Sequence, residues 1–365
     1  MGMGVEVGKR RWALLLFIGL AACSEPSGPS ALEGGMLSEP WPVGSAAAHG
    51  FDAVGLEAAL AAGQGIARLQ SLLVVRHGVI VAERYYRGGA RDVRADVRSV
   101  TKSIVSTLVG IALARGDLPS LDLTLGQVMP AELEGREPEK AGITIRDLLT
   151  MSSGFQWHEV GADGYSDWIT SGRPVEYLLD QPLVAEPGAE FEYNSAAVHV
   201  LGVVLERVLG RDLDSYAREV LFTPLGITAA VWEPFADGTV NGGSGLDLLP
   251  RDVAKVAQLA LQNGWTGTEQ LTEPAWFQEA SAPHFAWRAR VASMPSVSYG
   301  YLWWVSDTPG AFFAWGYGGQ FAYVVPGRDL VVVATSEWRA AGAAPSEVER
   351  AVLDLIVQKV VPTAR

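Results

Sequence analysis

A serine and a lysine three residues apart are the side chains of this 365-residue chain that most directly suggest chemistry. Ser99 and Lys102 precede the apolar run "SIVSTLVGIALA", which is typical of a buried helix. Residues three apart on a helix are neighbours on one face, so the lysine amine can reach the serine hydroxyl. A serine becomes nucleophilic when a nearby base takes its proton, and a desolvated lysine can lose its own proton and act as that base. The pair therefore predicts an activated serine.

The composition makes a chance occurrence of the Ser-x-x-Lys pattern less expected, although one structural alternative stays open. The chain holds few lysines, and only Lys102 has a serine three residues before it; the five are Lys9, Lys102, Lys140, Lys255 and Lys359. The alternative is a surface lysine in the first turn of a helix, beside a serine that caps the helix.

Two later segments also bear on chemistry, and each has a purely structural alternative. "EFEYNSAAVHVLG" (Glu190–Gly202) places Tyr193, Asn194 and Ser195 before a helix, where they could simply form the helix start. "AWGYGGQFAYVVP" (Ala314–Pro326) places a glycine-rich kink before a strand, where it could be a β-bulge or a hairpin turn. The second segment lacks the third glycine of a dinucleotide-binding loop and no helix follows it, which argues against phosphate binding.

The order of the expected elements predicts an α+β fold. Ser71–Gly89 has two β-branched runs around a tight turn at His77-Gly78, and a helix follows Ser99 and stops at Gly116. The chain is mostly helical from about 118 to 240. Strands then follow in "YGYLWWVS", "QFAYVVPG" and "DLVVVATS", and an amphipathic helix closes the chain. We expect one antiparallel sheet built from both ends of the chain and flanked by helices, with a mostly helical lobe inserted and a cleft between them.

The first residues predict export. Basic residues precede "WALLLFIGLAAC", an apolar run too short to span a bilayer, as in a secretory signal. The run ends at Cys23 in a sequence that resembles the bacterial lipoprotein box, in which the signal is cut before a cysteine that carries lipid. We expect a signal at 1–22, a flexible tether at 23–48 and the folded domain at 49–365, anchored in the periplasm or at the cell surface. The alternative is an ordinary signal peptide with a chance cysteine.

Charge and histidine spacing exclude other classes of function. The formal net charge is −13, which argues against nucleic acid and against electrostatic binding to anionic lipid, so any membrane attachment should be through the lipid. No two of the five histidines have the spacing of zinc ligands. We expect no metal and no cofactor. Nothing in the sequence indicates an oligomeric state.

Together these segments resemble the penicillin-recognising serine hydrolase family, which includes class C β-lactamases, D-alanyl-D-alanine peptidases, esterases and 6-aminohexanoate-dimer hydrolases. The resemblance covers about Gly50 to Val361. It includes Ser-x-x-Lys, then "TIRDLLTMSSG", the tyrosine motif, "GGSGLDLLPRDVAKVAQL" and the glycine-rich strand, in that order. It is closest to the esterase and 6-aminohexanoate-dimer hydrolase branch.

The resemblance implies a role for each matching residue. Ser99 would be the acylated nucleophile, Lys102 would hold and help deprotonate it, and Tyr193 would shuttle the proton, first as base and then as acid. The oxyanion hole would combine the main-chain N–H groups of Ser99 and Tyr317, with Gly318 as the next choice for the second donor. Ser195 would bond to Lys102 or to the substrate. We also predict substrate contacts from Gly318, Trp168 and Trp315, although any one tryptophan could instead be core.

Two departures from the family pattern narrow the expected activity. Ser195 stands where β-lactamases usually have asparagine, and Ala314-Trp315-Gly316 stands where they have Lys-Thr-Gly. That lysine helps to bind the substrate carboxylate, so its absence argues against β-lactamase or carboxypeptidase activity. We therefore predict a serine hydrolase acting on a small ester or amide. The alternatives are a penicillin-binding or β-lactamase-type enzyme, and an inactive relative that acts as a binding module.

Overall fold

The computed structural model describes residues 36–38, 40–161, 164–287, 291–306 and 310–365. Cys23 and the predicted signal lie outside the described residues. Within the part of the chain that the structure describes, no helix combines the length and the apolar character needed to cross a bilayer.

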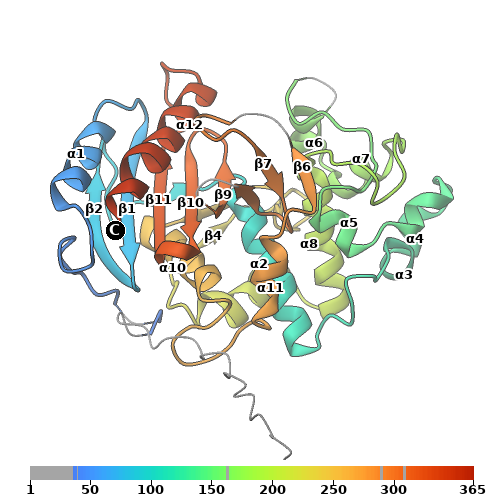
Figure 1. Ribbon diagram of the computed structural model, residues 1–365. Helices are drawn as coiled ribbons and strands as arrows, with labels where there is room; N and C mark the ends of the chain where they lie inside the picture. Colours follow the sequence, from blue (N-terminus) through green and yellow to red (C-terminus); the bar gives the residue numbers. More distant parts are fainter. Residues whose placement is uncertain (1–35, 39, 162–163, 288–290, 307–309) are drawn as a thin grey trace, which may run out of the picture. The chain divides into compact units, whose positions relative to one another are not determined.

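An eight-stranded antiparallel sheet forms the centre of the fold, in the order β2-β1-β11-β10-β9-β8-β7-β6 (Figure 1). Its first two strands come from the start of the described chain and the other six from its end, which confirms the predicted sheet built from both ends. The strands are β1 (Leu69–Arg76), β2 (Val79–Tyr85), β6 (Phe285–Trp287), β7 (Val297–Tyr299), β8 (Trp304–Ser306), β9 (Ala311–Gly316), β10 (Gln320–Val325) and β11 (Leu330–Ser336). A small second sheet has the order β3-β5-β4, with β3 (Ala95–Asp96), β4 (Val231–Trp232) and β5 (Leu246–Leu248).

Helices cover both faces of the large sheet. On one face lie α1 (Ala53–Gly63) and α12 (Pro345–Asp354), which continues as the turns η4 (Leu355–Val360) and η5 (Val361–Thr363) (Figure 1). The other face packs against α2 (Val100–Arg115) and α10 (Pro250–Leu261). The short 3₁₀ turn η3 (Pro326–Arg328) joins β10 to β11, and α11 (Ala275–Ala280) precedes β6.

The inserted lobe is mostly helical, as predicted. It contains α3 (Leu125–Val128), α4 (Pro130–Leu133), η1 (Pro138–Gly142), α5 (Ile145–Leu149), α6 (Tyr165–Thr170), α7 (Pro174–Leu179), α8 (Ser195–Leu209), α9 (Leu213–Ala217) and η2 (Arg218–Phe222). The buried helix α8 packs against α2, α5 and α7, so it ties the lobe to the helix that follows Ser99.

The hairpin β1–β2 turns at the residues that the sequence indicated. His77 and Gly78 have φ angles of 51° and 71°. Positive φ at both central residues is the requirement of the type I′ turn, whose twist suits two antiparallel strands. The register pairs Arg76 with Val79 directly across this turn.

The segment "YGYLWWVS" is not the single strand that we expected. It forms the end of β7 and the whole of β8, and the two strands pair with each other. Leu302, in the turn between them, has a φ of 60°, and its main-chain oxygen accepts a hydrogen bond from the Ser103 hydroxyl at 2.7 Å. The apolar run continues through a reversal because α2 holds this turn, an effect that periodicity does not reveal.

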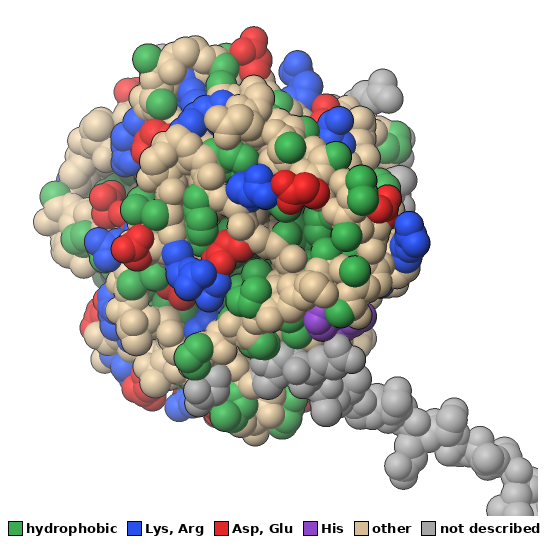
Figure 2. Space-filling model, turned by 90° about the vertical axis from the view of Figure 1, so that its left-hand side faces the viewer, with side chains coloured by type: hydrophobic (Ala, Val, Ile, Leu, Met, Phe, Trp, Pro, Cys, Tyr) green, Lys and Arg blue, Asp and Glu red, His purple; other side chains and the backbone are tan. Residues whose placement is uncertain are grey.

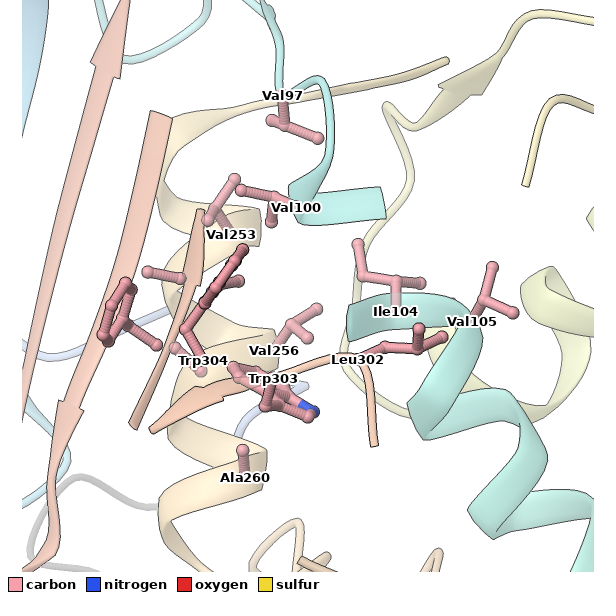
Figure 3. Packing of buried hydrophobic residues seen from close by; sticks show 14 of the residues in the cluster. Val97, Val100, Ile104, Val105, Val253, Val256, Ala260, Leu302, Trp303 and Trp304 are labelled. Carbon is pink, nitrogen blue, oxygen red and sulfur yellow. The ribbon is translucent and has the colours of Figure 1, made fainter. Parts of the chain in front are cut away.

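Apolar packing holds α2 and α10 in place behind the sheet. Val97 and Val100 lie at the start of α2, Val253 lies on α10, and Trp303 lies between the two helices (Figure 3). All four side chains are buried. Burying a large apolar side chain contributes about 1.5–3 kcal/mol. The start of α2, where Ser99 lies, is therefore fixed by the central core.

Charged side chains are interspersed on the face that carries α1 and β2. Figure 2 shows acidic and basic groups there among apolar and neutral ones, without a continuous basic patch.

Candidate active site

Ser99 and Lys102 lie side by side at the start of α2. The Nζ atom of Lys102 donates a hydrogen bond to the Ser99 Oγ at 2.9 Å. Ser99 occupies the position before the helix, but its hydroxyl caps no backbone N–H group. The alternative of a simple helix cap is therefore not what the structure shows, because the hydroxyl is directed to the lysine.

Lys102 is buried and has three acceptors. Besides Ser99, its Nζ donates to the Ser195 Oγ at 2.8 Å and to the Gly243 carbonyl oxygen at 2.5 Å. Only 1% of the residue is exposed, so it is not the surface lysine of the alternative interpretation. Burial lowers the pKa of Lys102 to about 8, against a smaller raising effect of the Glu159 charge. The amine can therefore lose its proton near neutral pH.

The third acceptor comes from the glycine-rich loop before β5. The side chain of Asn241 holds this loop by accepting hydrogen bonds from the N–H groups of Gly243 and Ser244, both at 3.0 Å. A Cβ atom on Gly243 would lie 2.4 Å from the main-chain oxygen of Ser195. Only glycine allows the loop to approach α8 this closely and to present its carbonyl to Lys102.

Asn194 and Ser195, at the start of α8, have different hydrogen-bonding roles. The Asn194 side chain caps the helix by accepting from the Ala197 N–H at 2.9 Å, so the helix-start interpretation is right for that residue. Ser195 instead accepts from Lys102, and its hydroxyl donates to a Glu159 carboxylate oxygen. Glu159 also accepts from the Ser195 N–H at 3.0 Å and from the Trp157 indole at 2.8 Å. A carboxylate therefore fixes the rotamer of Ser195.

Tyr193 directly precedes Asn194, the cap of α8, and its side chain lies beside Lys102. Its ring lies 5.0 Å from the Lys102 Nζ, and Tyr193 and Ser99 line the same pocket. The ring stacks on Trp304 at 5.6 Å between centroids, with an interplanar angle of 20°. Burial raises the pKa of Tyr193 well above its usual value, and the Glu159 charge raises it further. The phenol therefore keeps its proton at neutral pH.

A pocket opens over these groups. Its wall includes Ser99, Tyr193, three glutamates and a set of aromatic side chains; the lining residues beyond the two named are Glu159, Val160, Phe191, Glu192, Trp287, Trp304, Trp315, Tyr317 and Glu349. A substrate in this pocket can therefore contact the serine hydroxyl while its other groups lie against aromatic rings.

Two main-chain N–H groups fit the expected oxyanion hole. Ser99 and Tyr317 both line the pocket, and neither N–H has a hydrogen-bond partner among the described residues. The N–H of Gly318 donates instead to the Glu349 carboxylate at 2.7 Å. Of the two candidates for the second donor, Tyr317 is thus the one whose N–H is free.

Close packing brings the end of β9 beside α2. A Cβ atom on Gly316 would lie 2.3 Å from the main-chain oxygen of Val97, two residues before Ser99. Real Cβ atoms do not approach a carbonyl oxygen so closely. Glycine at 316 therefore allows the strand that carries Tyr317 to lie against the segment that carries the serine.

The structure places the two predicted tryptophans differently. Trp315 lines the pocket, with its ring 5.4 Å from that of Trp304. Trp168 does not line it, which corrects our prediction of a substrate contact. It is fully buried, its indole N–H donates to the Pro174 oxygen at 3.1 Å, and its ring packs against Phe235. Trp168 lies on α6, and its side of that helix faces the core of the helical lobe.

Several pocket residues were not found from the sequence. Glu159 and Glu349 line the pocket, but no motif in the sequence singled out either of them. Trp304 could have been suspected, because the two residues of "WW" on a strand point to opposite faces and only one of them can face the core. Trp303 is that core residue, and Trp304 faces the pocket.

Comparisons with known proteins agree with this geometry. A family model described as Beta-lactamase matches residues 56–355. The 6-aminohexanoate-dimer hydrolase of Paenarthrobacter ureafaciens is 28% identical over 291 residues, covering 73% of this chain and 72% of that protein. Esterase EstB of Burkholderia gladioli is 34% identical over 179 residues, covering 42% of this chain and 44% of that protein.

A likeness of fold extends to more distant structures. The penicillin-binding protein of Bacillus halodurans gives a TM-score of 0.63 at 17% identity, covering 82% of this chain and 99% of that one. The family model spans most of the described chain, and its match includes Ser99, Lys102, Tyr193 and the strand before Tyr317. These findings confirm the resemblance drawn from the sequence motifs, and the chain belongs to the β-lactamase family of serine hydrolases.

Proposed function

We propose that this protein is an exported, lipid-anchored hydrolase that cleaves small esters or amides through an acyl-enzyme on Ser99. The observation that carries the proposal is the convergence of three groups from two distant segments: Ser99 and Tyr193 line one pocket, and the buried Lys102 amine contacts both of them. A nucleophile, a base and an acid in mutual contact are what acyl transfer requires.

In the acylation step that we propose, the neutral Lys102 amine takes the Ser99 proton as Oγ bonds to the substrate carbonyl carbon. The carbonyl electron pair moves to its oxygen, where the N–H groups of Ser99 and Tyr317 stabilise the charge. When the tetrahedral intermediate collapses, the bond to the leaving group breaks, and the leaving oxygen or nitrogen takes a proton from the Tyr193 hydroxyl. Lys102, now protonated, returns a proton to the tyrosine.

Deacylation repeats these steps with water as the nucleophile. Water attacks the acyl carbon and loses a proton to the base, and the Ser99 oxygen leaves with a proton. The products are a carboxylic acid and the free enzyme. The lowered pKa of Lys102 and the raised pKa of Tyr193 favour this division of roles over one in which the phenol is the first base.

The pocket supports an ester or amide substrate more than a β-lactam. Ala314 stands at the position where a β-lactamase would present the lysine that holds a substrate carboxylate. Two relatives are named for ester and for short-amide hydrolysis. An inactive relative is the less favoured alternative, because a chain that no longer catalysed acyl transfer would have no need of a buried amine held by three acceptors.

Labelling of the serine tests this proposal. We expect a fluorophosphonate probe to modify Ser99 and the protein to hydrolyse short p-nitrophenyl esters faster than a chromogenic cephalosporin. Ser99→Ala should abolish both labelling and turnover. Ser106→Ala is the matched control, since this hydroxyl lies on the same helix and has no hydrogen-bond partner among the described residues. Labelling at another serine, or faster turnover of the cephalosporin, would contradict the proposal.

A further inference from the structure

Glu349 is a pocket residue to which the proposed reaction gives no role. It lies on α12, in the wall that also contains Ser99 and Tyr193. Its Oε1 accepts from the Gly318 N–H, and its Oε2 has no hydrogen-bond donor among the described residues. No lysine, arginine or histidine in the described chain pairs with this carboxylate. Burial raises its pKa to about 7.

A partly buried carboxylate without a cation is costly, because water no longer solvates it fully. A positively charged substrate group in the same pocket would relieve that cost. The unsatisfied charge of Glu349 is therefore a reason to look for a cationic ligand at this place.

The other charged side chains that line the pocket have the same sign as Glu349. Glu159 and Glu192 are the remaining ionised side chains of the described wall, and both are acidic. Lys102 is buried, and its three hydrogen bonds go to protein acceptors. Arg350 is exposed and lines an adjoining pocket with Glu349, but no ion pair joins the two described side chains. Residues 288–290 lie outside the described part of the chain. The wall as described repels a carboxylate and attracts an ammonium group.

Aromatic faces give such a cation a second kind of partner. The ring of Trp304 lies 5.1 Å from that of Trp287 and 5.4 Å from that of Trp315, and all three line the pocket with Glu349. Tryptophan is the best aromatic partner of alkylammonium groups, whose charge interacts with the negative face of the ring. A carboxylate beside such rings matches an alkylammonium group in both charge and shape.

From this placement we propose that the pocket takes esters or amides that carry an alkylammonium group, and that Glu349 is the specificity-determining residue that pairs with it. The inference rests on the proposed function and adds the substrate class to it. Glu349 is chosen over Glu159 because the carboxylate of Glu159 already accepts hydrogen bonds from Ser195 and Trp157. Substrates with a carboxylate in the same position should be disfavoured.

Two series of esters of matched shape test the charge preference. In the first, the leaving group varies: acetyl esters of thiocholine, of its neutral isostere dimethylbutanethiol and of mercaptopropionate. In the second, the acyl group varies: p-nitrophenyl esters with a trimethylammonium, a tert-butyl or a carboxylate terminus. In at least one series we expect kcat/KM for the cationic ester to exceed that of the neutral isostere by about tenfold, and the anionic ester to be slowest.

Glu349→Gln should bring the ratio of cationic to neutral kcat/KM close to one. The glutamine keeps an oxygen for the Gly318 N–H and removes only the charge. Glu347→Gln is the matched control, because it lies on the same helix, is exposed, and can still cap the helix through its side-chain oxygen. This control should keep the wild-type ratio.

A binding measurement keeps the inference testable without turnover. Calorimetry with pentyltrimethylammonium should give a Kd about tenfold higher for Glu349→Gln than for wild type or Glu347→Gln. The inference is overturned if both ester series show no preference for the cation, if the preference survives in Glu349→Gln, or if that variant binds the ammonium ion unchanged. Failure of Ser99 labelling would instead count against the proposed function and leave the calorimetric result to decide this inference.

Discussion

In the proposed mechanism, the charge state of the Lys102 amine decides whether Ser99 can be activated. Burial lowers the pKa of Lys102, and the negative charge of Glu159 raises it by a smaller amount. Glu159 acts across Ser195, whose hydroxyl accepts from the lysine and donates to the carboxylate. The glutamate is therefore a positioning residue that also sets how readily the base loses its proton.

This balance predicts a pH profile. Only the neutral amine can accept the Ser99 proton, so kcat/KM for a neutral ester should rise with pH through about 8, the pKa of Lys102. Glu159→Gln should move the midpoint of this rise to lower pH, because it removes the charge that raises the lysine pKa. The measurement is kcat/KM from pH 5 to 10, with Glu190→Gln, an exposed carboxylate outside the pocket wall, as the control. An unchanged or raised midpoint in Glu159→Gln would contradict this account.

Spacing alone could identify only residues whose partners are close along the chain, whereas Tyr193, Ser195 and Tyr317 were identified through the family resemblance. Ser99 and Lys102 share one helical turn, so their contact follows from spacing alone. Glu159 and Glu349 gain their places from tertiary packing, over 36 residues to Ser195 and 31 residues to Gly318. Trp168 and Trp304 are both tryptophans in mainly apolar segments, and nothing in those segments tells that Trp168 packs in the core whereas Trp304 lines the pocket.

At the scale of elements, the proposed oxyanion hole depends on the junction between β9 and α2. One donor belongs to the serine before α2 and the other to the turn after β9, and Gly316 lets the two segments touch. The strand end and the helix start must therefore keep their spacing to within a few tenths of an ångström.

Gly316→Ala should break this junction. The new methyl group would need to occupy space beside the Val97 oxygen, which would push Tyr317 away from the serine. We expect kcat for a neutral ester to fall by about 10²-fold or more, the usual cost of losing one oxyanion donor. Gly327→Ala is the control, since a Cβ atom there meets nothing within 4 Å. Full activity of Gly316→Ala with an unchanged Tm would show that the junction is not needed.

Element boundaries were predictable where local chemistry sets them. The turn at His77-Gly78 and the helix end at Gly116 both use residues that tolerate positive φ, and both were found from the sequence. The division of "YGYLWWVS" into two strands was missed because Leu302 is held in positive φ by contacts with α2 and α5, which are distant in the chain.

At the scale of the whole molecule, the proposed anchor determines where the enzyme works. Cys23 is the only cysteine, so a lipid label can be assigned to it without ambiguity. In a host that processes bacterial lipoproteins, the full chain should incorporate radioactive palmitate and partition into detergent. Cys23→Ser should lose the label, move to the aqueous phase and keep its esterase activity. Detergent partitioning that persists in Cys23→Ser would count against lipidation.

The arrangement of the whole sheet followed from the order of strands and helices along the chain. A hairpin near the start and strands near the end, with helices between, leave few ways to bury the apolar faces other than one shared sheet. Sequence could not give the register. The pairing of Val74 with Val332 and of Val75 with Val331 depends on side-chain packing across strands of similar composition.

The pairing of β1 with β11 has a consequence for biosynthesis. Leu69 lies opposite Ser336, so one edge of the early hairpin has no neighbour until the chain has been synthesised as far as β11. A nascent chain that has not yet produced its last strands exposes an open, apolar β edge, which invites aggregation. The large sheet can therefore close only after β11 has been synthesised, and until then the hairpin presents an edge that chaperones could protect.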